Sequence, residues 1–158
     1  MRCLWLGIAL AGCNVPSGEK GPTEAEIRLE VADAMERYQV AARSVIPDSI
    51  ASFYTETATL FEPGIMPVQG RDSIRAFIAS FAGVRVGVAT AMPDTIEILG
   101  GTALYWGTYF ERLSFPGQPE SEQHGKFIAE WVGQPDGRWL IQRLFRIPMP
   151  SPPSGGPP

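Results

Sequence analysis

Histidine, clustered basic residues and long apolar runs are scarce in this 158-residue sequence. His124 is the only histidine, which argues against catalytic triads built on histidine and against multi-histidine metal sites. Lysine and arginine number 13 against 17 acidic residues and form no cluster, so we expect no nucleic-acid partner. The longest apolar run, residues 3–12, is about half of the roughly 20 residues that a membrane-spanning helix needs. The sequence therefore excludes a spanning membrane protein.

Cysteine is also rare, and both cysteines lie in the first 13 residues. Arg2 precedes the apolar run, as in a secretory signal, and Leu10-Ala11-Gly12-Cys13 resembles the lipobox of bacterial lipoproteins. That resemblance implies cleavage before Cys13 and lipid attachment to its sulfur. Cys3 would leave with the signal, so no disulfide would be available to the mature chain. The alternative is a buried N-terminal helix or strand in which both cysteines are ordinary apolar residues.

Segments rich in Gly, Pro and Ser flank the rest of the chain. Residues 14–22 form an expected tether, and residues 148–158 form an expected disordered Pro-rich tail. The predicted folded domain therefore spans residues 23–147. With lipid on Cys13, the domain would be a membrane-anchored lipoprotein on the periplasmic side or the cell surface.

Three helices are predicted at the start of this domain. Thr23 and Glu26 form a capping box, and apolar residues then recur at three- and four-residue spacing as far as Val45. Pro47 is expected to break this long helix, and the residue after it is expected to cap a short second helix that includes Tyr54. Residues 71–81 place apolar side chains at i, i+3, i+4 and i+7, which predicts the third helix.

The remaining segments have the alternation and turn signals of strands. The predicted strands cover residues 57–62, 84–91, 95–99, 102–115, 124–132 and 138–147. Helices followed by a long antiparallel meander predict an α+β fold, in which a curved antiparallel sheet forms a cone-shaped barrel around the long N-terminal helix. The cavity between the concave face and this helix is the expected place for a small-molecule site.

Three stretches carry a family resemblance: ERYQVAARSVIPDSIASFYTETATLFEPG (36–64), VQGRDSIRAFIASF (68–81) and KFIAEWVGQPDGRWLIQRLF (126–145). They resemble SnoaL-like and ketosteroid-isomerase-like members of the nuclear transport factor 2-like superfamily. The resemblance covers nearly the whole domain and implies the same cone-shaped fold. It leaves activity open, because this superfold hosts isomerases, cyclases, dehydratases, hydrolases and binding modules without catalysis.

The resemblance to ketosteroid isomerases extends to single residues. It places Tyr38 on the tyrosine that donates to the oxyanion and Glu62 on the general-base aspartate, while the second oxyanion donor falls on Ala129. A Glu62 that faces an apolar cavity would have a raised pKa, as a base near neutrality needs. The alternatives are a core role for Tyr38 and a solvent-facing Glu62 beside the turn at Pro63.

Six further residues are expected to contact a ligand in the cavity: Tyr54, Trp106, Phe127, Trp131, Gln142 and Arg146. For the last strand, two registers are open. In one register Gln142 and Arg146 face the cavity, and Arg146 could hold a carboxylate or phosphate. In the other, the apolar face that includes Trp139 and Ile141 points inward and Arg146 is solvated.

Three functions are compatible with these observations. The first is a membrane-anchored extracytoplasmic domain that binds a small, largely apolar molecule, with no metal and no cofactor. The second is a cofactor-free isomerase or lyase with Glu62 as base and Tyr38 as oxyanion donor. The third is a dimeric interaction module without a functional pocket. Aromatic residues on both faces of the 102–115 strand predict a homodimer formed through the sheet.

Overall fold

Three helices are present among residues 21–150, which are the residues that the computed structural model describes. The predicted lipidation site at Cys13, the signal before it and most of the predicted tether and tail lie outside this range. The helices are α1 (Glu24–Ser44), α2 (Pro47–Ala51) and α3 (Arg71–Ala79). None of them is long and apolar enough to cross a membrane.

The boundaries of α1 and α2 follow from local backbone chemistry. The predicted capping box is present, because the Thr23 hydroxyl accepts from the Glu26 amide and the Glu26 carboxylate accepts from the Thr23 amide at 2.7 Å. Val45 ends α1 in the left-handed region, at φ 52°. The long helix ends before Pro47, as predicted, but the prediction that the residue after Pro47 caps the second helix is wrong. Ile46 is the N-cap of α2 and Pro47 is its first residue, where its missing N–H costs nothing.

Within the described part of the chain, residues 21–150, six strands form one sheet. They are β1 (Tyr54–Phe61), β2 (Val68–Gln69), β3 (Arg85–Leu99), β4 (Thr102–Ser114), β5 (Ser121–Gly133) and β6 (Trp139–Pro148), in the order β2-β1-β6-β5-β4-β3. The predicted α+β class is confirmed, but the sheet is mixed, because β6 returns beside β1 and runs parallel to it. The predicted break near Pro93 is instead a register shift within β3, where an edge strand tolerates proline.

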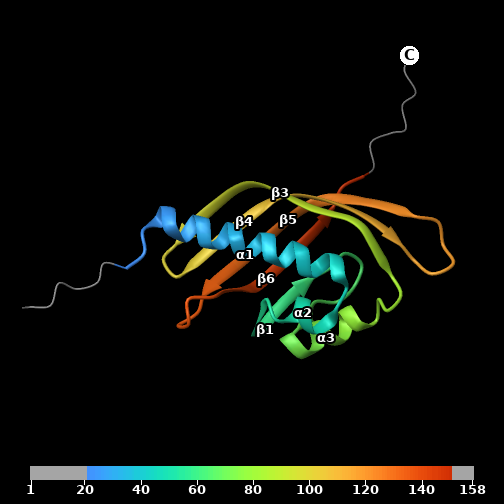
Figure 1. The fold of residues 1–158 in the computed structure, drawn as a ribbon, viewed down its shortest axis with the longest axis horizontal. Helices are drawn as coiled ribbons and strands as arrows, with labels where there is room; N and C mark the ends of the chain where they lie inside the picture. The colour runs from blue at the N-terminus through green and yellow to red at the C-terminus, as the bar shows by residue number, and fades with distance from the viewer. Residues whose placement is uncertain (1–20, 151–158) are drawn as a thin grey trace, which may run out of the picture.

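The long helix lies across one face of the sheet, with α2 and α3 at one end of it beside β1 (Figure 1). Strand alternation turns one set of side chains toward α1, and in β5 this set is apolar. Its members are buried: Phe127, Ala129 and Trp131. From the helix, Val31 and Met35 pack against them. The core therefore lies between α1 and the concave face of the sheet.

Polar side chains of α1 also bond to the open edge of β3. The side chain of Gln39 accepts from the Ala91 amide at 2.9 Å and donates to the Ala91 carbonyl at 3.4 Å, as a neighbouring strand would. Arg43 donates to the Ala89 carbonyl at 3.2 Å. These bonds satisfy edge groups of the sheet and attach the helix to the rim of the cone.

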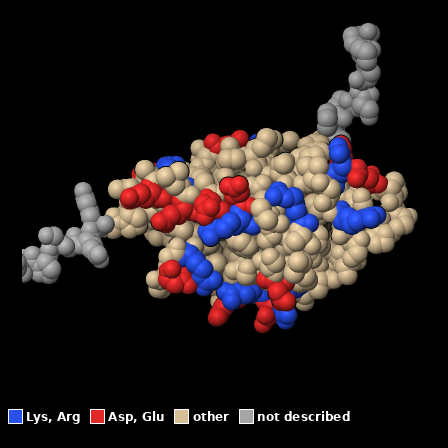
Figure 2. Space-filling model, viewed as in Figure 1, with Lys and Arg blue, Asp and Glu red and all other residues tan. Residues whose placement is uncertain are grey.

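The solvent face of α1 carries charges of both signs, which intermingle along the helix (Figure 2). Two of its ion pairs join residues one turn apart, Glu24 with Arg28 and Asp33 with Arg37. Exposed pairs of this kind contribute only about 0.3–0.5 kcal/mol each. The attachment of α1 therefore depends on its buried face and on its bonds to β3.

A bulge in β6 decides the orientation of its side chains. The register shifts between the β5 partners Glu130 and Trp131, so that Gln142 has no partner in β5. As a result Ile141 before the bulge and Leu144 after it both face α1 and are buried. Before the bulge, the structure therefore follows the register that turns Trp139 and Ile141 inward. After the bulge, it follows the register that turns Arg146 inward.

Candidate functional site

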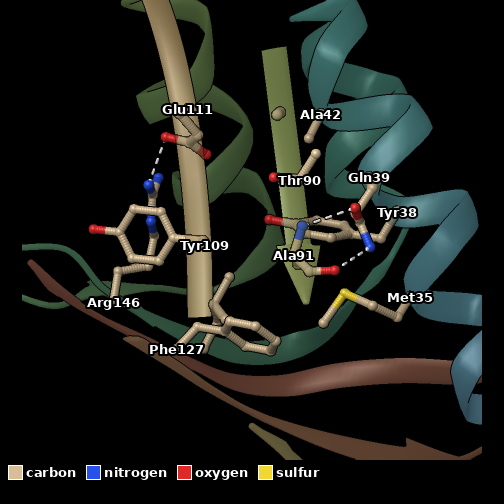
Figure 3. Close-up of a pocket in the computed structure, with 12 residues that line it drawn as sticks. Met35, Tyr38, Gln39, Ala42, Thr90, Ala91, Tyr109, Glu111, Phe127 and Arg146 are labelled. Carbon is tan, nitrogen blue, oxygen red and sulfur yellow. Dashed lines mark hydrogen bonds and ion pairs between the residues drawn. The ribbon is translucent and has the colours of Figure 1, made fainter. Parts of the chain in front are cut away.

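Two pockets lie between α1 and the concave face of the sheet. The α3 pocket, of about 160 Å³, is bounded by α1, α3, β1, β4 and β6 together with the start of β3. The β3 pocket, of about 70 Å³, lies between α1 and the middle of β3 (Figure 3). Four residues line both pockets: Tyr38, Ala42, Glu111 and Arg146. The two spaces therefore meet at one polar cluster.

Arg146 is the centre of this polar cluster. Its Nη2 lies 2.6 Å from the Glu111 carboxylate of β4, and its Nη1 lies 3.4 Å from the Glu62 carboxylate at the end of β1. Its guanidinium carbon lies 4.2 Å from the ring centroid of Tyr109, an arrangement suited to a cation–π contact (Figure 3). Each of the three charged side chains is only about one-fifth exposed.

Burial and mutual attraction act in opposite directions on this cluster. Desolvation raises the pKa of Glu62, and the negative charge of Glu111 adds to the rise, while Arg146 partly counters it. Desolvation disfavours the charged form of Arg146, but Glu111 and Glu62 together outweigh it and leave its pKa raised. Arg146 therefore stays charged, whereas the ionised form of Glu62 is less favourable than that of an exposed glutamate.

Two tyrosines complete the polar end of the α3 pocket. The hydroxyl oxygens of Tyr38 and Tyr54 lie 2.9 Å apart. Burial raises the pKa of Tyr38 to about 12 and that of Tyr54 well above its usual value, so both hydroxyls are neutral at physiological pH. When Tyr54 donates to Tyr38, the Tyr38 proton remains available for a ligand.

Aromatic neighbours fix the orientation of the Tyr38 ring. Phe53 and Trp131 meet it edge-on, with centroids 5.7 Å and 6.5 Å away. The indole Nε1 of Trp131 is buried and has no hydrogen-bond partner among residues 21–150. Ala129, where the resemblance places a second oxyanion donor, is completely buried and contributes only a methyl group. Among the groups that the resemblance assigns to oxyanion binding, only Tyr38 can therefore donate.

The structure brings together four of the residues expected from the sequence. Tyr38, Tyr54, Glu62 and Arg146 all line the α3 pocket. Tyr54 reaches it from the first position of β1, and its predicted place in the second helix is wrong, because α2 already ends at Ala51. The sequence left the orientation of Glu62 open. Because Glu62 lines the α3 pocket, its side chain points inward. Arg146 already holds two carboxylates, so it is not a free anchor for an anionic ligand.

The other four expected ligand contacts are dispersed. Phe127 lines the β3 pocket, and Trp131 packs against Tyr38 without lining either pocket. Trp106 alternates with the buried Tyr105 and lines a groove on the opposite face of the sheet. Gln142 hydrogen-bonds at its bulge to Thr55 at 2.7 Å and to Thr57 at 3.3 Å. Its amide is thereby held at the sheet, outside both pockets.

Glu111 is the main residue that the sequence analysis missed. It shares the inward face of β4 with Tyr105 and Tyr109, so strand alternation alone could have placed a carboxylate in the cavity. Gln39 of α1 also lines the β3 pocket and was missed, because a helix pattern does not reveal a bond to a strand edge. Residues 21–150 hold no group of three His, Cys, Asp or Glu side chains placed for a metal ion.

Solved structures share this architecture. A ketosteroid isomerase-like protein from Erwinia carotovora atroseptica SCRI1043 superposes with a TM-score of 0.70 at 13% identity, covering 78% of this chain and 96% of that one. A conserved protein from Planctomyces limnophilus DSM 3776 gives 0.70 at 19% identity, covering 78% and 98%. A nuclear transport factor 2-like protein with a cystatin-like fold from Novosphingobium aromaticivorans gives 0.60 at 20% identity, covering 77% and 81%. These likenesses show a nuclear transport factor 2-like fold.

Family membership comes from the sequence itself. No curated protein matches the chain. Residues 23–144, almost the whole of the predicted domain, match the SnoaL-like domain family, and the chain belongs to that family.

Proposed function

We propose that this SnoaL-like domain binds a small molecule with a largely apolar body in the α3 pocket. The observation that carries the proposal is the division of the pocket into two ends. Tyr38, Tyr54, Glu62, Glu111 and Arg146 form the polar end. Apolar side chains form the other walls: Leu60, Phe77, Ile78, Phe81, Val84, Val86 and Leu113. A few convergent polar groups in an apolar cavity are typical of small-molecule sites.

A pocket-filling variant tests this function. Ala42 lines both pockets, so Ala42→Phe should occupy the space that a ligand needs. Val40 lies on the same helix and is 55% exposed, so Val40→Phe is the matched control. The unmodified chain and Val40→Phe should both bind a ligand, and Ala42→Phe should not. Native mass spectrometry detects a co-purified compound, and nuclear magnetic resonance detects an added probe. Equal binding by Ala42→Phe would contradict the proposal.

Proton transfer without a cofactor is the second candidate, as in an isomerase or a lyase. It is favoured by the raised pKa of Glu62 and by the Tyr38 hydroxyl in the same pocket. Glu62 would take a proton from the carbon next to a carbonyl group, while Tyr38 donated a hydrogen bond to the oxygen that becomes negative. The methyl group of Ala129 weighs against high activity, because one missing oxyanion donor costs about 10² to 10³ in rate.

A turnover assay with Glu62→Gln decides this candidate. A β,γ-unsaturated ketone is a suitable substrate, since its conjugated product is followed by absorbance. Loss of a general base should lower the rate by about 10² to 10⁴. An unchanged rate would remove Glu62 from the mechanism. Glu97→Gln, on the exposed part of β3, is the control for the lost charge.

Dimerisation through the outer face of the sheet is a separate proposal. Trp106, Ile128 and Ile147 line a groove on this face, and Ile128 and Ile147 are 39% and 49% exposed. An exposed apolar groove on a sheet is suited to a second copy of the chain. Sedimentation should show a dimer that Ile128→Glu dissociates. The interaction module without a pocket is disfavoured, because a cavity reaches both Tyr38 and Glu62.

Membrane anchoring through Cys13 remains a proposal that rests on the sequence alone. The lipobox-like residues 10–13 support it, together with the apolar run before them. The chain should fractionate with membranes outside the cytoplasm, and Cys13→Ser should release it. Retention of Cys13→Ser in the membrane fraction would contradict the anchor.

A further inference from the structure

The polar cluster of the α3 pocket contains more negative than positive charge. Glu62 and Glu111 share one guanidinium, that of Arg146, with N–O distances of 3.4 Å and 2.6 Å. No other charged side chain lines either pocket among the described residues. With both carboxylates ionised, the cluster carries one uncompensated negative charge in a largely buried place, where charge without a partner is costly.

The same cluster leaves two carboxylate oxygens without a hydrogen-bond donor. Arg146 binds one oxygen of each carboxylate, Oε1 of Glu62 and Oε2 of Glu111. The second oxygen of each receives no hydrogen bond from any group of residues 21–150. The Tyr38 hydroxyl, when Tyr54 donates to it, adds one proton against these two free oxygens. A protonated amine supplies three donors and one positive charge, which complements both features.

An anionic ligand fits this arrangement poorly. The Nη atoms of Arg146 already face two carboxylates, and one face of its guanidinium lies over the Tyr109 ring. A ligand carboxylate or phosphate would approach two negative side chains before it reached the guanidinium. Like charges repel more strongly in a largely buried place than in bulk water.

We propose that the α3 pocket selects ligands whose polar group is a protonated amine on an apolar body, held by the free oxygens of Glu62 and Glu111. This inference rests on the proposed small-molecule function and adds the chemical class of the ligand. The raised pKa of Glu62 is consistent with it, because a bound cation would offset the desolvation that disfavours the ionised carboxylate. The other titratable groups that face this position are Tyr38, Tyr54, Glu111 and Arg146.

Three probes of the same shape test the charge preference: cyclohexylamine, cyclohexanol and cyclohexanecarboxylate. Each is titrated into the full-length chain at pH 7 and followed by nuclear magnetic resonance. The amine, which is protonated at this pH, should bind about tenfold more tightly than the alcohol, and the carboxylate most weakly. Equal or tighter binding of the alcohol or the carboxylate would overturn the inference and leave the small-molecule function standing. Binding of none of the three would overturn both.

Substitution of one carboxylate tests the assignment to this cluster. Glu111→Gln removes the surplus charge and leaves Arg146 paired with Glu62, so the amine and the alcohol should then bind within about threefold of each other. Glu62→Gln should have the same effect and serves if Glu111→Gln folds poorly. Glu122→Gln removes a carboxylate from an exposed pair with Arg112 and should keep the full preference. A preference that survives both pocket substitutions, or that Glu122→Gln removes equally, would overturn the inference.

Discussion

The hydroxyl of Tyr38 on α1 lies 2.9 Å from the hydroxyl of Tyr54 at the start of β1. This bond joins the long helix to the strand that leads to Glu62, and the two rings pack edge-on at a centroid distance of 6.0 Å. Tyr54 is 1% exposed and reaches only the α3 pocket, whereas Tyr38 is half-buried and borders both pockets. Water can therefore replace this hydrogen bond more easily for the Tyr38 hydroxyl than for the Tyr54 hydroxyl.

Removal of the two hydroxyls should destabilise the fold unequally. Tyr54→Phe leaves Tyr38 with access to the pockets, where water can satisfy it, so the expected loss is about 1 kcal/mol. Tyr38→Phe takes the only hydrogen-bond partner from the Tyr54 hydroxyl, which water reaches less easily because Tyr54 is 1% exposed, so the expected loss is larger, about 1–3 kcal/mol. Urea unfolding of both variants measures the difference. An equal or larger loss for Tyr54→Phe would show that Tyr54 has another partner.

The stability of the fold should depend on the protonation of Glu62. Burial raises the pKa of Glu62 in the folded chain above its usual value of 4.5, so the folded state favours the protonated form. This contribution is complete below pH 4.5 and is lost as pH rises through the folded pKa. Glu62→Gln cannot ionise and should escape the loss. As pH rises above 4.5, the melting temperature of Glu62→Gln should therefore increase relative to that of the unmodified chain.

Two results would contradict this pH dependence. One is a difference in melting temperature that does not change with pH, and the other is a difference that shrinks as pH rises. Glu122→Gln, which removes an exposed carboxylate from β5, reports the effect of net charge alone. Far-ultraviolet circular dichroism at each pH confirms that the variants start from the same fold.

Closure of the cone should depend on the bond between Gln39 and β3. Gln39→Ala removes a donor and an acceptor from the backbone of Ala91, and the expected loss is about 1 kcal/mol in the free energy of unfolding. Amide exchange along β3 should also accelerate, because the strand edge loses its partner. Arg37→Ala breaks only an exposed ion pair with Asp33 and should change stability by less than about 0.5 kcal/mol. Similar losses in the two variants would contradict this role of Gln39.

Local signals predicted most of the fold because they act within a few residues. The capping box at Thr23 and the apolar spacing of residues 71–81 each fix a helix without reference to the rest of the chain. Alternation along residues 124–132 likewise predicted a strand, and the structure has β5 there. The parallel pairing of β1 with β6 could not be predicted in this way, because it joins segments far apart in sequence.

The site was predicted only in part for the same reason. Tyr38 and Glu62 could be placed by their spacing and by resemblance, and both reach the α3 pocket. The partners of Arg146 come from two other strands, and its inward orientation depends on a bulge at Gln142 that no local pattern marks. The charge balance of the pocket became visible only once Glu111 was placed beside Arg146.

The position of the Tyr109 ring, over which the Arg146 guanidinium lies, should require glycine at position 125. Gly125 of β5 lies against the Tyr109 ring, and a Cβ there would approach Tyr109 Cε1 at 2.8 Å and the backbone of Ile147 and Pro148. Gly125→Ala must therefore displace the ring over which the Arg146 guanidinium lies. We expect a loss of about 1–3 kcal/mol in urea unfolding, together with weaker binding of cyclohexylamine.

The control for this substitution is a glycine with free space around it. A Cβ on Gly101 would meet no atom within 4 Å, and its φ is not positive, so Gly101→Ala should be neutral or stabilise the chain by about 0.4–1 kcal/mol. If Gly125→Ala were as stable as Gly101→Ala and bound the amine normally, Tyr109 could move without disturbing Arg146. The position of the guanidinium would then depend on its ion pairs with Glu62 and Glu111 rather than on the ring beneath it.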